Sequence, residues 1–302
     1  MHLLNFKEWD SRRLEKLIDS ALHIKKKPEK YIDALKGCSL AMIFQKTSTR
    51  TRVAFEVAMY QMGGHALYID WRTTQFTMAD IKDETRYLSR NVNGILARVK
   101  KHEDLRRMAE ASLVPVINGC CEKYHPTQAV ADLMTMKEKK GYLKGLKLVY
   151  IGVHNNVCNS LIEACTKLGV KITTVTPIIN EASIDSELLE EAEKTGLYSK
   201  TENVRAAMLE ADFVYTDTWV DMEFFQDPSY KPELDQRTRL MKPYQINAEL
   251  LKGSKAMVMH DMPIHRDYEI SDEVVDSPQS IIFDQSENRL YSAKSVLLHL
   301  LT

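Results

Sequence analysis

The stretch SLAMIFQKTSTRTRVAFEVAMYQMGG, residues 39–64, joins an apolar run to a helical pattern through a short polar segment. The apolar run at 39–44 is typical of a buried strand, because a strand covered on both faces is continuously hydrophobic. From residue 53 onward the apolar residues follow a helical spacing. A strand that leads into a helix is the repeating unit of a parallel sheet, so this stretch predicts an α/β fold.

The rest of the chain repeats this alternation of short apolar runs and helical patterns. In the first half, we expect further strands at 66–69, 94–99 and 113–118. The pattern then restarts, and we expect strands of a second series at 146–152, 170–175, 211–217, 255–260 and 280–283. Two such series predict two doubly wound parallel-sheet domains, each with helices on both faces of its sheet.

Two long helical patterns define how the domains are connected. The pattern at 127–145 is expected to join the domains, and a last helix at about 284–301 is expected to return and pack on the first domain. The predicted domains are therefore 1–135 together with 284–302, and 146–283. The length of 302 residues also favours two domains over one.

The composition is that of an ordinary globular protein and narrows the classes of partner. The chain is 44% hydrophobic and 27% charged, with a formal net charge of -1. This charge gives no support for a nucleic acid or a membrane surface as partner, and no apolar run is long enough to span a bilayer.

The N-terminus becomes charged too early for a signal peptide. The five cysteines show no metal-ligand spacing and fit a reducing compartment. We therefore expect a cytoplasmic protein without a bound metal.

The polar segment at 47–52 holds four hydroxyl residues and two arginines at the start of the helical pattern. A helix N-terminus presents unpaired N–H groups and a partial positive charge. Hydroxyl donors and Arg50 at this point predict a site for an oxyanion such as phosphate. The alternative is a capped helix whose arginines face solvent. The chain contains neither GxxxxGK[ST] nor GxGxxG, so a small phosphorylated substrate is favoured over a nucleotide.

Polar residues also follow other predicted strands. They are Arg98, the segment YHPTQ at 124–128, the segment TDTWVDME at 216–223 and the segment HDMPIHR at 260–266. Ligands of open parallel sheets bind beyond the carboxyl ends of the strands, so these residues are candidates for a site.

Taken together, these motifs resemble those of the aspartate/ornithine carbamoyltransferase family, and of its ornithine branch in particular. The segment from Ser48 to Arg52 resembles the carbamoyl-phosphate motif, and residues 125–128 resemble the family's His-Pro-x-Gln. Residues 217–219 resemble the start of Asp-x-x-x-Ser-Met-Gly, and residues 260–263 stand where the branch has His-Cys-Leu-Pro. Residues 287–294 resemble the last family helix with its arginine. The first domain is also similar to that of putrescine carbamoyltransferases.

The resemblance implies that a neutral amine attacks the carbonyl carbon of carbamoyl phosphate and that phosphate leaves. With ornithine as the acceptor, the products would be citrulline and phosphate. This chemistry needs no covalent enzyme nucleophile, metal or cofactor. The protein must hold the phosphate, polarise the carbonyl and neutralise the developing oxyanion. The resemblance also implies a homotrimer with sites between subunits.

The resemblance assigns roles on the carbamoyl-phosphate side. Ser48, Thr49, Arg50 and Thr51 would bind the phosphate. Arg98 and His125 would reach the carbonyl oxygen and the phosphate, Gln128 would bind the carbamoyl NH2, and Arg289 would complete the anion clamp. Taken singly, Arg98 and Arg289 are also compatible with surface arginines, and His125 with a core histidine.

The resemblance also assigns the amine side. Asn156 and Asp217 would hold the α-amino and α-carboxylate end of ornithine, together with the loop that contains Asp221 and Met222. Asn155 and Asn156 are equally compatible with a simple helix cap. The resemblance also implies a cis bond between Met262 and Pro263, with the Met262 carbonyl facing the carbamoyl NH2.

Three departures from the family pattern concern the acceptor. Asp221-Met222-Glu223 stands in place of Ser-Met-Gly, Asp261 in place of a cysteine, and the loop at 73–84 lacks the usual glycines. New carboxylates near the amine would repel the α-carboxylate of ornithine unless they point away, whereas a diamine such as putrescine would gain. Asp261 either accepts the proton that the amine must lose or pairs with Arg266 or His265.

Three hypotheses about activity therefore remain at this point. The first is transfer to ornithine, and the second is transfer to another amine such as putrescine. The third is a paralogue that binds carbamoyl phosphate without turnover. Putrescine carbamoyltransferases carry an extra helix beyond the last family helix, and this chain stops at Thr302, which weighs against putrescine.

Overall fold

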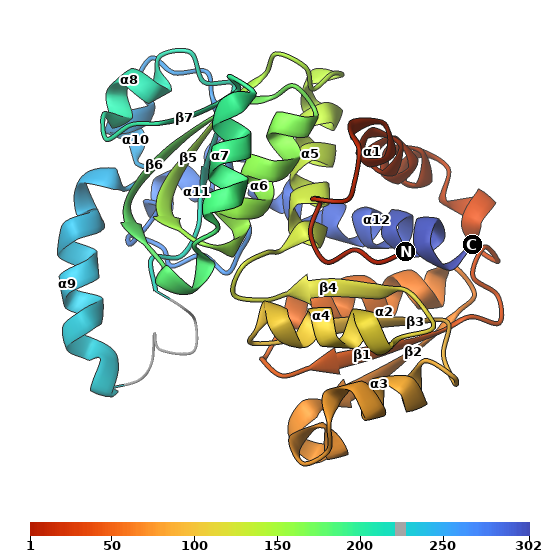
Figure 1. The fold of residues 1–302 in the computed structure, drawn as a ribbon. Helices are drawn as coiled ribbons and strands as arrows, with labels where there is room; N and C mark the ends of the chain where they lie inside the picture. The colour runs from red at the N-terminus through yellow and green to blue at the C-terminus, as the bar shows by residue number, and fades with distance from the viewer. Residues whose placement is uncertain (221–227) are drawn as a thin grey trace. The chain divides into compact units, whose positions relative to one another are not determined.

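The computed structural model describes residues 1–220 and 228–302. The predicted amine-side residues Asp221, Met222 and Glu223 lie outside the described residues. The chain divides into two compact units (Figure 1). Unit 1 comprises Met1–Lys139 and Glu287–Thr302, and unit 2 comprises Lys140–Ser286. Among the helices of the described ranges, none combines the length and the apolar character needed to cross a membrane.

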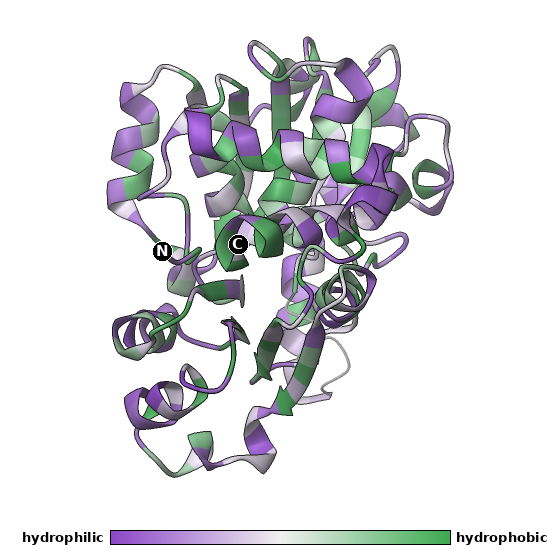
Figure 2. Ribbon diagram, turned by 90° about the vertical axis from the view of Figure 1, so that its right-hand side faces the viewer, coloured by the Kyte–Doolittle hydropathy of each residue, from purple (hydrophilic) through white to green (hydrophobic). Residues whose placement is uncertain are grey.

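Unit 1 contains a four-stranded parallel sheet with the order β2-β1-β3-β4. Its strands are β1 (Ser39–Phe44), β2 (His65–Asp70), β3 (Gly94–Arg98) and β4 (Val116–Cys120). The central strand β1 is buried from Leu40 to Phe44, as its continuous apolar sequence predicts. In Figure 2 the strands are predominantly hydrophobic, whereas the helices carry both kinds of residue.

The helices of unit 1 follow the predicted alternation. They are α1 (Ser11–Lys26), α2 (Thr49–Gln61), α3 (Ile81–Leu88), α4 (His102–Ala111), α5 (Pro126–Lys140) and the part of α12 (Ile282–Leu301) that starts at Glu287. Short 3-10 turns occur at Pro28–Tyr31, Trp71–Thr73 and Gln75–Thr77.

Helix α2 shows how a local sequence sets the boundaries of an element. Its buried residues recur at the spacing of one helical face: Thr51, Ala54, Phe55, Ala58 and Met59. The helix ends before Gly63, which has a φ of +80°. A Cβ at Gly63 would also lie 2.9 Å from the Ile32 carbonyl oxygen, so only glycine fits at this helix end.

Unit 2 contains a five-stranded parallel sheet with the order β7-β6-β5-β8-β9. Its strands are β5 (Lys147–His154), β6 (Lys171–Ile179), β7 (Tyr198–Lys200), β8 (Phe213–Thr216) and β9 (Met257–His260). A buried cluster includes Val149, Val214 and Val258, one residue from each of three adjacent strands.

The helices of unit 2 are mostly short. They are α6 (Asn156–Lys167), α7 (Ser186–Lys194), α8 (Val204–Met208), α9 (Lys231–Met241), α10 (Ala248–Leu251) and α11 (Asp272–Val275). Three 3-10 turns occur at Glu181–Ser183, Pro228–Tyr230 and Lys242–Tyr244, and the first residues of α12, as far as Ser286, also belong to this unit.

In each sheet, the chain first adds strands on one side of its first strand and later adds the remaining strands on the other side of that strand. In unit 1 this strand is β1, which pairs with both β2 and β3. In unit 2 it is β5, which pairs with both β6 and β8. Such switch points are where open α/β sheets bind ligands. The segments that follow β1, β3, β5 and β8 therefore lie where the sequence analysis expects site residues.

The fold class is confirmed, and three predicted segments need correction. The strand expected at 280–283 is wrong, because Ser280 makes only an isolated bridge with Val258 and α12 begins at Ile282. Short apolar runs do not distinguish a strand from a buried helix start. The helix expected at 127–145 ends at Lys140. The strand expected at 113–118 begins at Val116, directly after Pro115, which has no N–H group to donate to a sheet.

Strand β7 was not predicted. It consists of the three residues Tyr198–Lys200 at the edge of the sheet, and two of them are exposed. A short edge strand has neither the apolar run nor the length that marks the buried strands.

Candidate functional site

The N-terminus of α2 lies directly after β1, at the switch point of the unit 1 sheet. Ser48 is the N-cap residue with an extended backbone, and its side chain makes no capping hydrogen bond among the described residues. A serine at this position usually caps the helix through its hydroxyl. The helix therefore starts with its first N–H groups uncapped by Ser48, which does not support the alternative of an ordinary capped helix.

Arg289 brings a guanidinium group to the first turn of α2. Its Nη2 donates a hydrogen bond of 2.9 Å to Thr51 Oγ1, and both side chains are buried. The two residues are 238 positions apart, so only the position of α12 in unit 1 brings them together. A helix N-terminus with an adjacent arginine combines N–H donors and positive charge, as a bound phosphate requires.

Two further arginines of this region, Arg98 and Arg52, have different environments. Arg98 lies at the carboxyl end of β3, and its Nε is buried without a hydrogen-bond acceptor among the described residues. Arg52 instead lies over the ring of Tyr68, at 3.9 Å from the centroid, and pairs with Glu56 at 3.1 Å. Of these two, Arg98 is the one available for an anion or a carbonyl oxygen.

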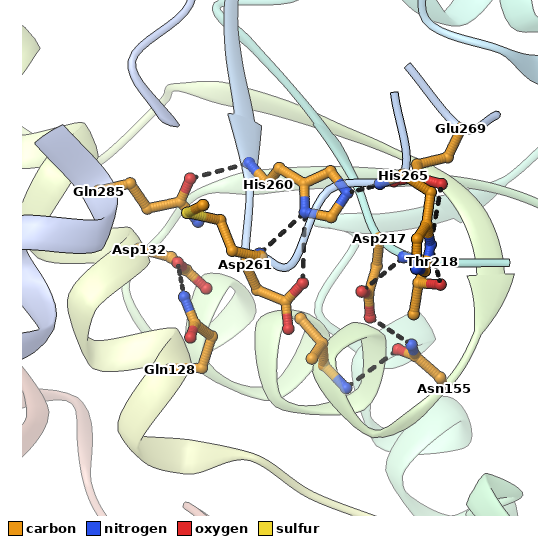
Figure 3. Close-up of polar contacts among 12 residues, drawn as sticks. Gln128, Asp132, Asn155, Asp217, Thr218, His260, Asp261, His265, Glu269 and Gln285 are labelled. Atoms are coloured by element: carbon orange, nitrogen blue, oxygen red, sulfur yellow. Dashed lines mark hydrogen bonds and ion pairs between the residues drawn. The ribbon is translucent and has the colours of Figure 1, made fainter. Parts of the chain in front are cut away.

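His125 and Gln128 lie at the start of α5, after β4. His125 is buried, and its Nδ1 lies 3.4 Å from Thr127 Oγ1. Gln128 is also buried, and its Nε2 donates a hydrogen bond of 2.8 Å to Asp132 Oδ1 (Figure 3). Because Asp132 can only accept while ionised, it fixes the orientation of the Gln128 amide.

The oriented amide of Gln128 leaves its carbonyl oxygen for a ligand. Gln128 Oε1 is buried and accepts no hydrogen bond from the described residues. Such an oxygen requires a donor, for which the NH2 of a carbamoyl group is suited. Asp132 was missed by the sequence analysis, although its spacing of four residues from Gln128 on a helix is a usable signal.

On the unit 2 sheet, Asn155 connects two of the strands at their carboxyl ends. Its Oδ1 caps α6 by accepting from the backbone N–H groups of Val157 and Cys158, at 3.0 and 3.1 Å. Its Nδ2 donates a hydrogen bond of 2.6 Å to Asp217 Oδ2. Asn155 is therefore a cap, as one alternative held, and also positions Asp217. The neighbouring Asn156, predicted to bind substrate, accepts from the Val157 N–H at 2.9 Å.

Asp217 is a buried carboxylate at the end of β8. Its Oδ1 accepts a hydrogen bond of 2.6 Å from the backbone N–H of Thr218. Burial is the main cause that raises the pKa of Asp217 well above its usual value, and the nearby Asp261 adds to it. Asp217 also adds to the effect of burial that raises the pKa of Tyr150.

Hydrogen bonds of His260 fix the segment that follows β9 (Figure 3). Its backbone N–H donates to Gln285 Oε1 at 2.8 Å, and its Nδ1 accepts from the Met262 N–H at 2.9 Å. Its Nε2 therefore carries the proton and donates to Glu269 Oε1 at 3.1 Å. Burial lowers the pKa of His260, but hydrogen bonds with Asp261 and Glu269 outweigh burial and raise it to about 9. The Met262 contact opposes this increase, because an imidazolium has no lone pair on Nδ1 to accept from the Met262 N–H, so the observed geometry is that of the neutral imidazole.

Glu269 is a further residue that the sequence analysis did not identify. It is buried between His260 and the backbone N–H of His265, which donates to it at 2.5 Å. Burial raises the pKa of Glu269, but these hydrogen bonds outweigh burial and lower it. Nothing in the local sequence marks Glu269, because its contacts depend on how the chain folds after β9.

The segment after Asp261 matches one specific prediction. The peptide bond between Met262 and Pro263 is cis, as expected, and Met262 has a φ of 60°. The direction in which the Met262 carbonyl meets a ligand stays a prediction.

The structure identifies other partners for the two groups considered as partners of Asp261. Arg266 pairs with Asp272 and Asp276, the latter at 2.7 Å. His265 lies 3.0 Å from Thr218 Oγ1 and 3.7 Å from Glu269. Asp261 lies instead beside His260, with Oδ1 at 3.6 Å from Nδ1, and beside Asp217. These contacts favour a role for Asp261 in the site over a surface ion pair.

Asp217, His260 and Asp261 also form a group that could hold a metal ion by distance. One possible ligand atom from each lies within 4.8 Å of the others. However, Nδ1 of His260 accepts from the Met262 N–H, and the Asp217 oxygens accept from Asn155 and Thr218. These atoms already have hydrogen-bond partners, so the geometry fits a polar network better than a metal centre.

The loop expected to approach a neighbouring subunit contains two short turns and the start of α3. The rings of Trp71 and Phe76 pack at a tilt of 35°, with centroids 4.9 Å apart, and Met78 is 81% exposed. Whether this loop reaches a neighbouring site stays a prediction.

Comparisons with known proteins cover the whole chain. Residues 1–138 match the family described as aspartate/ornithine carbamoyltransferase, carbamoyl-P binding domain, and residues 144–300 match its Asp/Orn binding domain. The ornithine carbamoyltransferase of Archaeoglobus fulgidus is 42% identical over 306 residues, which cover 99% of this chain and 97% of that protein. The one from Pyrococcus horikoshii is 44% identical over 275 residues, covering 88% and 84%. The solved ornithine carbamoyltransferase from Pyrococcus furiosus aligns with a TM-score of 0.90 and 40% identity, covering 98% and 95%.

Proposed function

The chain belongs to the aspartate/ornithine carbamoyltransferase family, and we therefore propose that it transfers the carbamoyl group of carbamoyl phosphate to the side-chain amine of ornithine. The products are citrulline and phosphate. The names of the relatives support ornithine as the acceptor, because several relatives at 42–45% identity are named ornithine carbamoyltransferase.

The start of α2 is the observation that carries the proposal. Ser48 leaves the helix N-terminus without a side-chain cap, and Arg289 reaches the same turn through Thr51. We assign Ser48, Thr49, Arg50 and Thr51 to the phosphate. A helix start with a buried arginine beside it is suited to an anion, because its N–H groups and the positive charge both attract one.

The other residues of unit 1 are assigned to the carbamoyl group. Arg98 and His125 stabilise the oxyanion that develops on the carbonyl oxygen, since donors aimed at that oxygen lower the barrier. Gln128 accepts a hydrogen bond from the carbamoyl NH2 through its buried oxygen, which has no donor among the described residues. Unit 1 is thus proposed as the carbamoyl-phosphate-binding domain.

Unit 2 is proposed as the amine-binding domain. Asn156 and Asp217 bind the amino-acid end of ornithine, the Met262 carbonyl binds the carbamoyl NH2, and Asp261 lies near the attacking amine. Asp221 and Met222 belong to the same proposed set and lie outside the described residues.

A diamine is the second candidate for the acceptor. The observation that favours it is the carboxylate of Asp261 beside that of Asp217. Two carboxylates attract an ammonium group and repel the α-carboxylate of ornithine, whereas putrescine carries no carboxylate.

We further propose a cytoplasmic homotrimer that acts in arginine metabolism. All five cysteines are free, which fits a reducing compartment. On unit 1, the neighbouring elements α2 and β2 expose Val53, Tyr60, Leu67 and Tyr68, and an exposed apolar set of this kind is suited to contact between subunits. Sedimentation of the purified protein measures the state of assembly.

A phosphate-release assay tests the activity. Carbamoyl phosphate is offered with ornithine, putrescine, lysine, 2,4-diaminobutyrate, acetylornithine or aspartate, and the carbamoylated product is identified by mass spectrometry. We expect citrulline and stoichiometric phosphate with ornithine. Turnover with putrescine alone would support the diamine, and no turnover with any amine would support a paralogue that only binds carbamoyl phosphate.

A further inference from the structure

Two carboxylates of unit 2 lie close together in a buried setting. Asp217 directly follows β8 and is 5% exposed, and the side chain of Asp261, directly after β9, is 12% exposed. One oxygen of each lies within 4.8 Å of the other, and Figure 3 shows both residues beside His260. Two full negative charges at this distance repel each other strongly where water is excluded. The pair is therefore stable only with a shared proton or with a cation beside it.

The groups that face the pair come from three elements. They are Tyr150 of β5, Cys158 of α6 and His260 of β9. Burial raises the pKa of Tyr150 and of the Cys158 thiol, so both are neutral at ordinary pH. His260 is the basic member of this set, with Glu269 and His265 behind it. Its Nδ1 accepts from the Met262 N–H, so the geometry is that of a neutral imidazole. His260 lowers the pKa of Asp217, whereas burial and Asp261 raise it. Burial and Asp261 together outweigh His260, so the pKa of Asp217 is raised.

The proposed reaction needs a group that takes a proton from the acceptor. An alkyl amine is an ammonium ion at neutral pH, because its pKa is about 10. It must lose one proton before nitrogen can attack a carbonyl carbon. A carboxylate whose proton affinity is raised by burial and by a like charge is a better acceptor for that proton than an ordinary aspartate.

We propose that Asp217 and Asp261 share one proton in the free protein and act as a unit that admits the ammonium group of the acceptor and then takes one of its protons. This inference rests on the proposed function and deepens it, because it assigns the proton acceptor and places Asp217 at the attacking amine rather than at the amino-acid end of ornithine. Asp261 is the residue that distinguishes this chain from the His-Cys-Leu-Pro pattern of the branch it resembles. A neutral thiol at that position would leave Asp217 as a single carboxylate.

The protons balance over one cycle. The arriving ammonium ion displaces the shared proton to solvent, and the ionised pair then accepts one proton from the nitrogen. The neutral nitrogen forms the C–N bond, and the bond between the carbonyl carbon and the phosphate oxygen breaks. The second nitrogen proton leaves with phosphate as hydrogen phosphate. The pair is left with one shared proton, as it began.

The first test is the pH dependence of kcat/KM for ornithine in the wild type, Asp261→Asn and Asp261→Cys. The acidic limb reports the free protein, so we expect both variants to shift this limb to lower pH by about one unit or more. Glu191→Gln, which removes an exposed carboxylate on α7 of the same unit, is the matched control and should leave the limb in place. A limb that stays in place in both Asp261 variants while the rate falls would overturn the proposal, because it would show a merely structural residue.

The second test needs no ligand and no activity. Infrared titration of the free protein detects a protonated carboxyl group directly. We expect the wild type to retain such a group to a higher pH than Asp261→Asn and Asp261→Cys do, by about one unit or more. Identical titrations in all three proteins would refute the shared proton. A shifted titration without turnover of any amine would support the pair and reject the proposed function, so the two failures are distinguishable.

Discussion

At the level of single residues, the amide of Gln128 is oriented by one carboxylate. Asp132 accepts from its NH2 group at 2.8 Å and leaves the carbonyl oxygen buried and unused by the described residues. The two residues are one helical turn apart, so the arrangement is set within α5. The chemistry that Gln128 offers to a ligand is thus decided by a residue that need not touch the ligand.

Asp132→Ala removes this orientation and is expected to lower kcat/KM for carbamoyl phosphate by about tenfold, the equivalent of one net hydrogen bond. Asp132→Asn keeps an oxygen that can accept from Gln128 and is expected to retain most of the activity. Steady-state kinetics with thermal melting of both variants measure the effect. Equal losses in the two variants would mean that the negative charge of Asp132 matters rather than its acceptor.

Arg289 is expected to bind the phosphate through its guanidinium group as well as its charge. Arg289→Lys keeps the charge but loses the planar fork that reaches Thr51, so we predict about a tenfold loss in kcat/KM for carbamoyl phosphate. Arg289→Gln removes the charge too, and we predict about a hundredfold loss. Kinetics at varied carbamoyl phosphate measure both, and an unchanged KM in Arg289→Gln would exclude Arg289 from the phosphate site.

At the level of elements, the start of α2 differs from the start of α7, where a side chain caps the helix. The N-cap residue of helix α7 is Asp185, whose side chain accepts from the Leu188 N–H at 3.1 Å. Ser48 makes no such bond at the start of α2 within the described part of the chain. A cap that contributes no hydrogen bond to its own helix leaves the hydroxyl and the N–H groups for a ligand.

Ser48→Ala and Asp185→Ala separate the two kinds of helix start. We expect Ser48→Ala to change the free energy of unfolding by less than about 0.5 kcal/mol and to raise KM for carbamoyl phosphate by about tenfold. Asp185→Ala should reduce the free energy of unfolding by about 1 kcal/mol and leave that KM unchanged. Urea unfolding and steady-state kinetics give the two quantities. A stability loss in Ser48→Ala without a change in KM would restore the view of Ser48 as an ordinary cap.

At the level of the whole molecule, the buried contact between His260 and Glu269 links stability to pH. Hydrogen bonds with His260 and His265 outweigh burial and hold the pKa of Glu269 below its usual value of 4.5. The unfolded chain therefore takes up a proton at Glu269 more readily than the folded chain does. The stability that this residue contributes is present above about pH 4.5 and is lost as the pH falls through the lower folded value.

Glu269→Ala leaves His260 without its buried partner and is expected to reduce the free energy of unfolding at pH 7 by about 3 kcal/mol. Glu269→Gln keeps one acceptor oxygen and should lose less. Urea unfolding between about pH 3 and pH 7 measures both effects. The wild type should lose stability on acidification more steeply than Glu269→Gln, and parallel curves would contradict a lowered pKa for Glu269.

Local sequence was sufficient to predict the strands and helices whose apolar residues follow a regular pattern over a few residues. Strand β1 was predicted at its observed bounds, and the approximate positions of the other buried strands along the chain follow from continuous apolar runs. These strands depend on residues adjacent in the chain, which is why a single sequence determines them. The cis bond between Met262 and Pro263 was expected from the family resemblance instead.

Tertiary structure decided the contacts that give the side chains their chemistry. Arg289 meets Thr51 across 238 positions, and Asn155 meets Asp217 across 62. The apolar run at 280–283 became the start of α12 rather than a strand, because packing selects between two states that short apolar runs allow equally. The sequence by itself therefore determined the fold class and the motifs. Only the folded chain paired Asp217 with Asp261 and His260 with Glu269, because burial and proximity between distant segments are properties of the packed structure.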